Sequence, residues 1–252
     1  MSDQERPAKA ARETPLTDEI TPWMHGLAGL TRLGFAGLTR IRVEGALDAI
    51  PKGGPIILAA NHASNLDPLV MAAFVLPKVG RRFQWLGKKE LFAWPVLGWV
   101  ARNGGVHPVD RGTADVEAFR LARRILDEGH ILFVFPEGTR SADGRLQEAR
   151  DGTSVLALRT DAPILPVGIA GSHAVWPRGQ KVPHPGGRVT VRIGTPFRLS
   201  DVLPEGTDRR AAKGLATTHI MRRIAAQLPP EQRGAYADTD VHAIRPPAPP
   251  ER

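Results

Sequence analysis

The chain has 252 residues, of which 42% are hydrophobic and 24% are charged, enough for one globular domain with a sizeable core. It contains no cysteine, which excludes disulfides, thiolate metal sites and a cysteine nucleophile. The formal net charge is +8, so we expect an anionic partner such as anionic lipid, a phosphate-bearing substrate or nucleic acid.

The first 42 residues divide into a polar part and an apolar part. Residues 1–19 lack the apolar core of a secretory signal and are predicted to be a disordered leader. Residues 20–42 carry an apolar series that is interrupted by Arg32, namely Trp23, Met24, Leu27, Leu30, Leu33, Phe35 and Leu38. No apolar run in the chain reaches the roughly 18 residues that a transmembrane helix needs. We therefore expect residues 20–42 to form an amphipathic helix that lies in the membrane interface.

Beyond residue 42, apolar strands alternate with helices. The predicted strands are 55–60, 81–86, 106–112, 130–135, 164–170 and 188–194, the last with the alternation of a half-exposed edge. The predicted helices are 68–76, 90–103, 113–128 and 208–228. This order predicts an α/β fold with a mixed, largely parallel sheet flanked by helices on both faces. The domain is expected to cover 43–230, followed by a proline-rich disordered tail at 231–252.

The segment NHASNLDP, residues 61–68, directly follows the buried strand 55–60. Ligands of α/β folds bind at such strand ends. A histidine beside an aspartate can act as a general base, because the carboxylate fixes the tautomer and stabilises the imidazolium. His62 and Asp67 are therefore candidates for deprotonating an alcohol. The alternative is a hydrogen-bonding loop histidine and an N-cap aspartate, with Pro68 at the first helical position.

The segment FPEGTRS, residues 135–141, follows the next apolar strand, 130–135. Its turn at Glu137 and Gly138 can present backbone N–H groups together with the Thr139 hydroxyl. The planar guanidinium of Arg140 suits a phosphate. The turn therefore predicts a binding site for an anionic head group, with a tight turn and a solvated arginine as the alternative.

Between these segments, residues 88–112 carry Lys88 and Lys89 and end in Asp110 and Arg111. Arg111 can join Arg140 in holding a phosphate, with a lysine adding charge. The alternative is that the lysines are ordinary surface bases of a basic protein.

Taken together, these segments resemble the glycerophospholipid acyltransferase family over roughly residues 40–200. Its first motif, NHxSxxD, is matched by Asn61, His62, Ser64 and Asp67, and its third by FPEGTRS. Residues 88–112 resemble the second motif and 164–172 the fourth. One departure concerns 148–152, EARDG, where family members commonly carry a phenylalanine followed by two basic residues and a glycine.

The resemblance implies an O-acyltransferase in which His62 is the general base and Asp67 orients it. The substrate-binding residues that it implies are Asn61, Ser64, Lys88, Arg111, Glu137, Gly138, Thr139 and Arg140. The acceptor would be 1-acyl-sn-glycerol 3-phosphate and the co-substrate acyl-coenzyme A or acyl carrier protein, with no metal or other cofactor. We expect a peripheral or monotopic enzyme on anionic lipid at the cytoplasmic face of a membrane, without a nucleic-acid partner.

Two alternatives stay open at the level of the sequence. The acceptor can instead be glycerol 3-phosphate, another lysophospholipid, or a glycolipid or aminolipid hydroxyl. The chain can also be a basic lipid-binding protein without catalytic activity, although such a protein has no need of the His62 and Asp67 pair.

Overall fold

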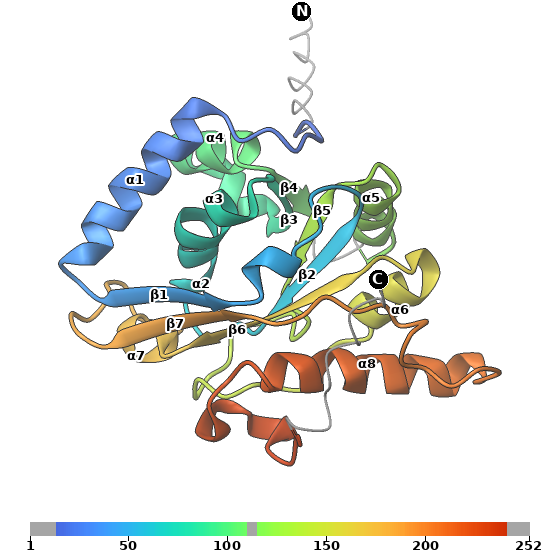
Figure 1. Cartoon of the computed structure of the whole chain (residues 1–252). Coiled ribbons are helices and arrows are strands. Elements are labelled where there is room, and N and C mark those ends of the chain that lie inside the picture. The colour runs from blue at the N-terminus through green and yellow to red at the C-terminus, as the bar shows by residue number, and fades with distance from the viewer. Residues whose placement is uncertain (1–13, 110–114, 241–252) are drawn as a thin grey trace, which may run out of the picture.

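The computed structural model describes residues 14–109 and 115–240, with Asp115 described by its backbone alone. Within these residues, seven strands form one sheet in the order β1-β7-β6-β2-β5-β3-β4 (Figure 1). The strands are β1 (Arg40–Gly45), β2 (Ile56–Ala60), β3 (Phe83–Lys88), β4 (Val106–Val109), β5 (Ile131–Val134), β6 (Ile164–Ala170) and β7 (Arg188–Ile193). All neighbouring pairs are parallel except β6 with β7. Consequently β1 and β7 run opposite to the other five.

Helices cover both faces of the sheet. The helices are α1 (Pro22–Ala36), α2 (Asp67–Val70), α3 (Leu76–Val79), α4 (Pro95–Asn103), α5 (Asp115–Asp127), α6 (Gly152–Thr160), α7 (Ser172–Val175) and α8 (Arg209–Ala225). A π-helical turn, η2 (Met71–Val75), joins α2 to α3, and the 3-10 turns are η1 (Leu47–Ala49), η3 (Lys89–Ala93), η4 (Pro230–Gln232) and η5 (Gly234–Tyr236).

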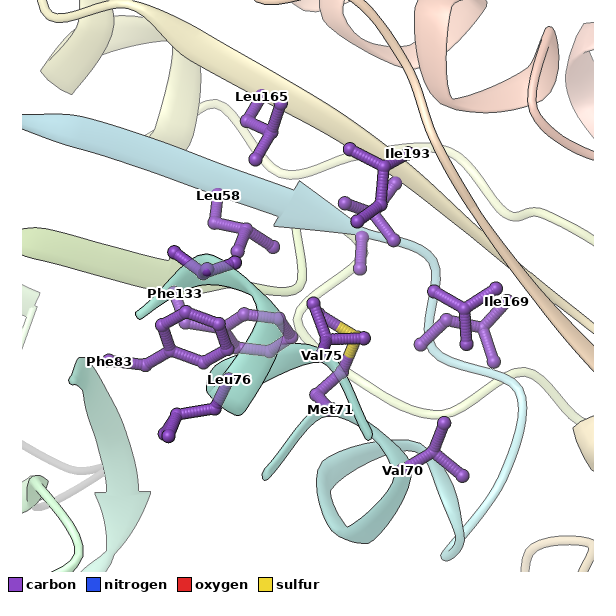
Figure 2. Packing of buried hydrophobic residues seen from close by; sticks show 14 of the residues in the cluster. Leu58, Val70, Met71, Val75, Leu76, Phe83, Phe133, Leu165, Ile169 and Ile193 are labelled. Atoms are coloured by element: carbon purple, nitrogen blue, oxygen red, sulfur yellow. The ribbon is translucent and has the colours of Figure 1, made fainter. Parts of the chain in front are cut away.

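The central strand β2 divides the core in two. Ile56, Leu58 and Ala60 face the cluster that includes α2 and α3, where Figure 2 shows Met71 and Val75 close to Phe83 and Phe133. Ile57 and Ala59 face the cluster that includes α5, α6 and α8. Successive side chains of a strand point to opposite faces, so a strand buried on both faces reads as a continuous apolar run. The predicted α/β fold with a largely parallel mixed sheet and helices on both faces is confirmed.

The region around Arg40 differs from the prediction. The helix expected at 20–42 ends at Ala36, and residues 40–45 form β1, a strand that the sequence reading did not include. In β1 the exposed Arg40 and Arg42 alternate with the half-buried Ile41 and Val43, the period of a strand. Because β1 pairs with β7, the strand at 188–193 is internal, and its predicted edge position is wrong.

The helical segment after Asp67 continues past Pro77, where the sequence reading ended it. It runs to Val79 and is followed by Gly80 in the left-handed conformation, at φ 73°. Proline has no N–H for the carbonyl of Ala73 four residues earlier. That carbonyl accepts a hydrogen bond from Nε of Arg32 in α1, at 2.7 Å. Arg32 interrupts the apolar stretch of the sequence, and its hydrogen bond to Ala73 holds α1 against the domain.

Two segments that the sequence assigns to disordered ends contact the domain. Residues 14–19 lie against β3 and β4: the N–H of Arg82 donates to the carbonyl of Asp18 at 2.9 Å, and the hydroxyl of Thr14 to that of Val106 at 2.9 Å. Residues 231–240 include the end of η4 and the whole of η5, and the N–H of Leu146 donates to the carbonyl of Gln232 at 2.9 Å. Backbone and side-chain hydrogen bonds to the domain thus hold both polar segments in place. Residues 1–13 and 241–252 lie outside the described part.

Candidate active site

His62 and Asp67 meet just beyond the carboxyl end of β2. Nδ1 of His62 lies 2.9 Å from Oδ2 of Asp67, whose side chain is 0% exposed, whereas that of His62 is 15% exposed. The same carboxylate oxygen accepts the backbone N–H groups of Ala63 and Ser64, each at 2.8 Å. A carboxylate only accepts, so the shared hydrogen belongs to Nδ1 and the lone pair to Nε2. Within the described part of the chain, Nε2 has no hydrogen-bond partner.

The N-cap position predicted for Asp67 is wrong. Helix α2 begins at Asp67 itself, and Leu66 before it already has helical angles. The carboxylate turns back to the loop at 62–64 instead of capping the helix, because that loop brings two N–H groups and an imidazole within hydrogen-bond distance of one oxygen. The structure therefore contradicts the alternative in which Asp67 only caps a helix.

Glu137 of the third motif, FPEGTRS, holds the backbone of His62 in place. Its Oε1 accepts the N–H of His62 at 2.6 Å, and its Oε2 accepts that of Gln147 at 2.9 Å. Burial raises the pKa of Glu137 to about 7, against the opposing effect of these two hydrogen bonds. The carbonyl of His62 in turn accepts the N–H of Ser141 at 2.8 Å. The two motifs are thus joined through the backbone of His62.

Phe135 lies flat against the imidazole of His62. The ring centroids are 3.8 Å apart and the planes 11° from parallel. The ring therefore limits how the imidazole can turn about its side-chain bonds. The sequence reading gave this residue no role, and its only signal was its position at the start of the third motif, FPEGTRS.

Asn61 and Ser64, predicted to bind substrate, are engaged with the protein itself. The amide of Asn61 donates to the carbonyl of Ile169 at 3.0 Å and accepts its N–H at 2.7 Å, which joins the end of β2 to β6. The hydroxyl of Ser64 donates to the carbonyl of Trp176 at 2.6 Å and accepts the N–H of Leu66 at 3.0 Å. Both side chains are buried and hold the loop that carries His62.

The turn at Gly138, Thr139 and Arg140 gathers two further arginines. Gly138 has φ 68°, and a Cβ on it would lie 2.8 Å from Cδ of Arg150, so the stem of Arg150 lies against the turn. Nη1 of Arg178 donates to the carbonyl of Arg140 at 3.4 Å. Arg150 and Arg178 were not among the predicted binding residues. For Arg150 the signal was its positive charge in the departing segment 148–152, and for Arg178 we find none.

The other predicted basic residues are not seen in contact with the turn at 138–140 within the described part of the chain. Lys88 is exposed at the carboxyl end of β3, on the same edge of the sheet as His62. Asp151, which replaces a base commonly found in the family, forms an ion pair with Lys213 of α8 at 2.7 Å. Arg111 lies outside the described residues, so its predicted place beside Arg140 stays a prediction.

The described ranges, 14–109 and 115–240, contain no group of three or more His, Asp or Glu side chains arranged to hold a metal ion. In the same ranges no helix has the length and apolar character required to cross a bilayer.

A family model described as Acyltransferase matches residues 40–170, which include His62, Asp67 and the turn at 136–140. The chain belongs to this family.

Relatives and a solved structure of the acyltransferase family agree with this assignment. The chain is 31% identical to "1-acyl-sn-glycerol-3-phosphate acyltransferase LPAT1, chloroplastic" of Arabidopsis thaliana, over 65% of this chain and 46% of that protein. It is 34% identical to a 1-acyl-sn-glycerol-3-phosphate acyltransferase of Limnanthes alba, over 58% and 51%. The chain thus spans about half the length of these curated relatives.

The crystal structure of the 1-acyl-sn-glycerophosphate acyltransferase PlsC from Thermotoga maritima aligns with a TM-score of 0.62 at 27% identity. The alignment covers 80% of this chain and 78% of that one. The shared fold therefore extends over most of the chain rather than over a local motif.

Proposed function

We propose that this protein transfers a fatty acyl group from a thioester to the free hydroxyl of 1-acyl-sn-glycerol 3-phosphate, giving phosphatidic acid. The observation that carries the proposal is the His62 and Asp67 pair, which fixes the imidazole with Nε2 available. The names of the relatives from Arabidopsis thaliana and Limnanthes alba favour the same acceptor.

In the proposed mechanism, Nε2 of His62 accepts the proton of the acceptor hydroxyl while the oxygen attacks the thioester carbonyl. The C–S bond then breaks, and the leaving thiolate takes the proton from the imidazolium. Asp67 stabilises the positive charge that forms on the ring between these two steps. A positioned general base of this kind contributes roughly 10²- to 10⁴-fold to a rate. No covalent acyl-enzyme is required.

The acceptor's phosphate is proposed to bind at the arginine-bearing turn. Arg140 is the principal ligand, and Arg150 and Arg178 add positive charge because both contact this turn. Lys88 and Arg111 remain predicted contributors. Holding the phosphate presents the hydroxyl to His62, an orientation effect that can lower the barrier by several kcal/mol.

Helix α1 is proposed to bring the enzyme to its lipid substrate. It exposes Leu30 and Leu33, and a helix of this kind lies in the interface plane of a bilayer. The net charge of +8 favours an anionic membrane surface. A peripheral or monotopic enzyme at the cytoplasmic face, using acyl-coenzyme A or acyl carrier protein without another cofactor, follows as part of the proposal.

The deciding experiment is release of free thiol from palmitoyl-coenzyme A by purified protein in detergent, with and without 1-acyl-sn-glycerol 3-phosphate. We expect release that requires both the acceptor and His62. The matched control is His130→Ala, because His130 also contacts an aspartate and is exposed to a similar degree. Parallel reactions with glycerol 3-phosphate, lysophosphatidylcholine and an acyl carrier protein donor identify the acceptor and the donor. Acceptor-independent release, or full release by His62→Ala, contradicts the proposal.

A further inference from the structure

Helix α4 has an unusual distribution of residue sizes. The side that packs on the domain carries the small residues Gly98 and Ala101. Trp94, Val96 and Trp99 face outward, and Trp94 is 69% and Val96 78% exposed. Most helices of a soluble domain bury their large apolar residues and expose polar ones. This helix therefore leaves much of its apolar outer face exposed within the described chain.

The outer face of α4 continues onto α1. The rings of Trp23 in α1 and Trp99 in α4 are in contact, with centroids 5.0 Å apart, and Figure 1 shows the two helices on the same side of the molecule. We call the combined area the α1–α4 surface. Its exposed members are Leu27, Leu30, Leu33, Trp94, Val96, Leu97 and Trp99. Contiguous exposed apolar areas of this kind mark interaction sites rather than ordinary protein surface.

The α1–α4 surface borders the catalytic edge of the sheet. The chain reaches α4 from the carboxyl end of β3, the edge at which β2 delivers His62. Leu69, two residues after Asp67, is exposed one helical turn before Ala73, whose carbonyl binds Arg32 of α1. An amphipathic molecule held by this surface would thus lie next to the catalytic pair.

The charges around α4 indicate what this partner is. Lys88 and Lys89 precede the helix, and Arg102 lies in its last turn over the ring of Phe92. Tryptophan with flanking lysine and arginine is the composition of membrane-interface segments. A second copy of this chain would bring another net charge of +8, which opposes association, whereas an anionic bilayer is complementary.

We propose that α4 is a second membrane-contacting element, which enters the interface of an anionic bilayer beside α1. Two contacts fix the orientation of the domain as well as its distance from the bilayer, so that the carboxyl edge of the sheet faces the lipid. The inference rests on the proposed function only in taking the acceptor to be a membrane lipid.

Vesicle binding of the full chain tests the role of α4. The vesicles contain equal parts of phosphatidylcholine and phosphatidylglycerol, and the variant is Trp94→Ser with Val96→Ser. Position 94 is the N-cap of α4, where serine is favourable, so the variant is expected to fold. The control is Val116→Ser with Leu215→Ser, which removes exposed apolar residues from α5 and α8.

We expect the α4 variant to lose about tenfold in partition coefficient, while the control binds as the wild type does. Lipids brominated near the head group are expected to quench the tryptophan fluorescence of the wild type, and less so that of Trp94→Phe. The inference is overturned if the α4 variant partitions like the wild type. It is also overturned if that variant loses only self-association in sedimentation experiments, which would assign the surface to a second copy.

Binding and chemistry are separated by His62→Ala. This variant is expected to bind vesicles like the wild type, because His62 is not one of the exposed apolar residues of the α1–α4 surface. If thiol release fails but the α4 effect on binding is found, the transferase proposal falls and the inference about α4 stands. If thiol release is found but the α4 variant binds normally, the inference falls alone.

Discussion

A histidine contacts an aspartate at each end of the sheet. His62 and Asp67 lie beyond the carboxyl end of β2, with the atoms 2.9 Å apart, and His130 and Asp18 lie before the amino end of β5, at 2.8 Å. The histidines are 15% and 16% exposed, so neither distance nor exposure of the ring distinguishes the pairs. The difference lies in what else each aspartate binds.

Asp18 already has a cation. Arg81 donates to its carboxylate at 2.7 Å and also to the carbonyls of Gly54 and Gly129, so it binds residues 14–19 to the amino ends of the strands. Asp67 has no ion pair with a lysine or arginine of the described chain and is fully buried. A positive charge that forms on His62 is therefore stabilised by an otherwise unbalanced carboxylate, whereas His130 would gain much less from Asp18. Whether a His–Asp contact suits proton transfer therefore depends on the other charges that the aspartate contacts.

The largest expected effect is that of His62→Ala on acyl transfer. Loss of the base should lower the rate by about 10³-fold or more, with the protein still folded. Thiol release and thermal unfolding measure the two quantities. His130→Ala is expected to retain the rate within about twofold. If His62→Ala and His130→Ala lowered the rate of acyl transfer equally, the proposed difference between the two His–Asp pairs would be wrong.

Asp67→Asn should be severe but less than total, at about 10²- to 10³-fold in the rate. The amide keeps the shape of the side chain but loses the charge that orients and stabilises the ring. The check is kcat with saturating acceptor, together with circular dichroism to show that the loop is intact. Activity equal to the wild type would remove Asp67 from the mechanism.

Arg140→Ala should raise the KM for the phosphate-bearing acceptor about 10- to 100-fold and change kcat less, because the guanidinium binds a group remote from the reacting atoms. The matched control is Arg120→Ala, an exposed arginine of α5. Steady-state kinetics over a range of acceptor concentrations separate KM from kcat. An unchanged KM would assign Arg140 to structure.

Asp18→Asn should leave kcat unchanged and lower the free energy of unfolding by about 2 kcal/mol, since it weakens the contacts of a buried arginine and a histidine. Urea denaturation provides the free energy, and thiol release provides kcat. A large loss of kcat without loss of stability would mean that the amino end takes part in catalysis.

The last expected effect is a change in stability that depends on pH. Burial lowers the pKa of His107 to about 4, below the 6.5 of an unfolded histidine, so the unfolded chain binds a proton between these values while the native one does not. The stability contributed by His107 is therefore complete above pH 6.5 and declines toward pH 4. His107→Gln should gain about 2 kcal/mol relative to the wild type between pH 7 and pH 5. Urea denaturation at both values measures this difference, and a constant difference would contradict it.

The pH dependence of His107 has to be measured as a difference between His107→Gln and the wild type, because Glu137 titrates in the same pH range. Its pKa is raised from 4.5 to about 7, so the stability it contributes is complete below pH 4.5 and declines as the pH rises toward 7. The two groups thus oppose each other between pH 4.5 and 6.5, and the pH profile of the wild type alone would hide both.

Local patterns in the sequence predicted the strands that are buried on both faces, since runs such as 55–60 leave little choice of structure. They missed β1, because a six-residue strand with arginines at alternate positions looks polar until its partner β7 is known. The motifs likewise identified His62 and Asp67 as neighbours. They could not indicate that Asn61 and Ser64 hold the loop, because their partners, Ile169 and Trp176, lie more than a hundred residues away.

The bond between Arg32 and the carbonyl of Ala73 has a consequence for sequence variation. That carbonyl is accessible to α1 because the residue four positions later is Pro77, which has no N–H to donate. In a chain with another residue at position 77, an ordinary helical hydrogen bond would compete for the same oxygen, and an arginine at position 32 would lose its partner. Positions 32 and 77 are therefore expected to co-vary among relatives, although 45 residues separate them along the chain.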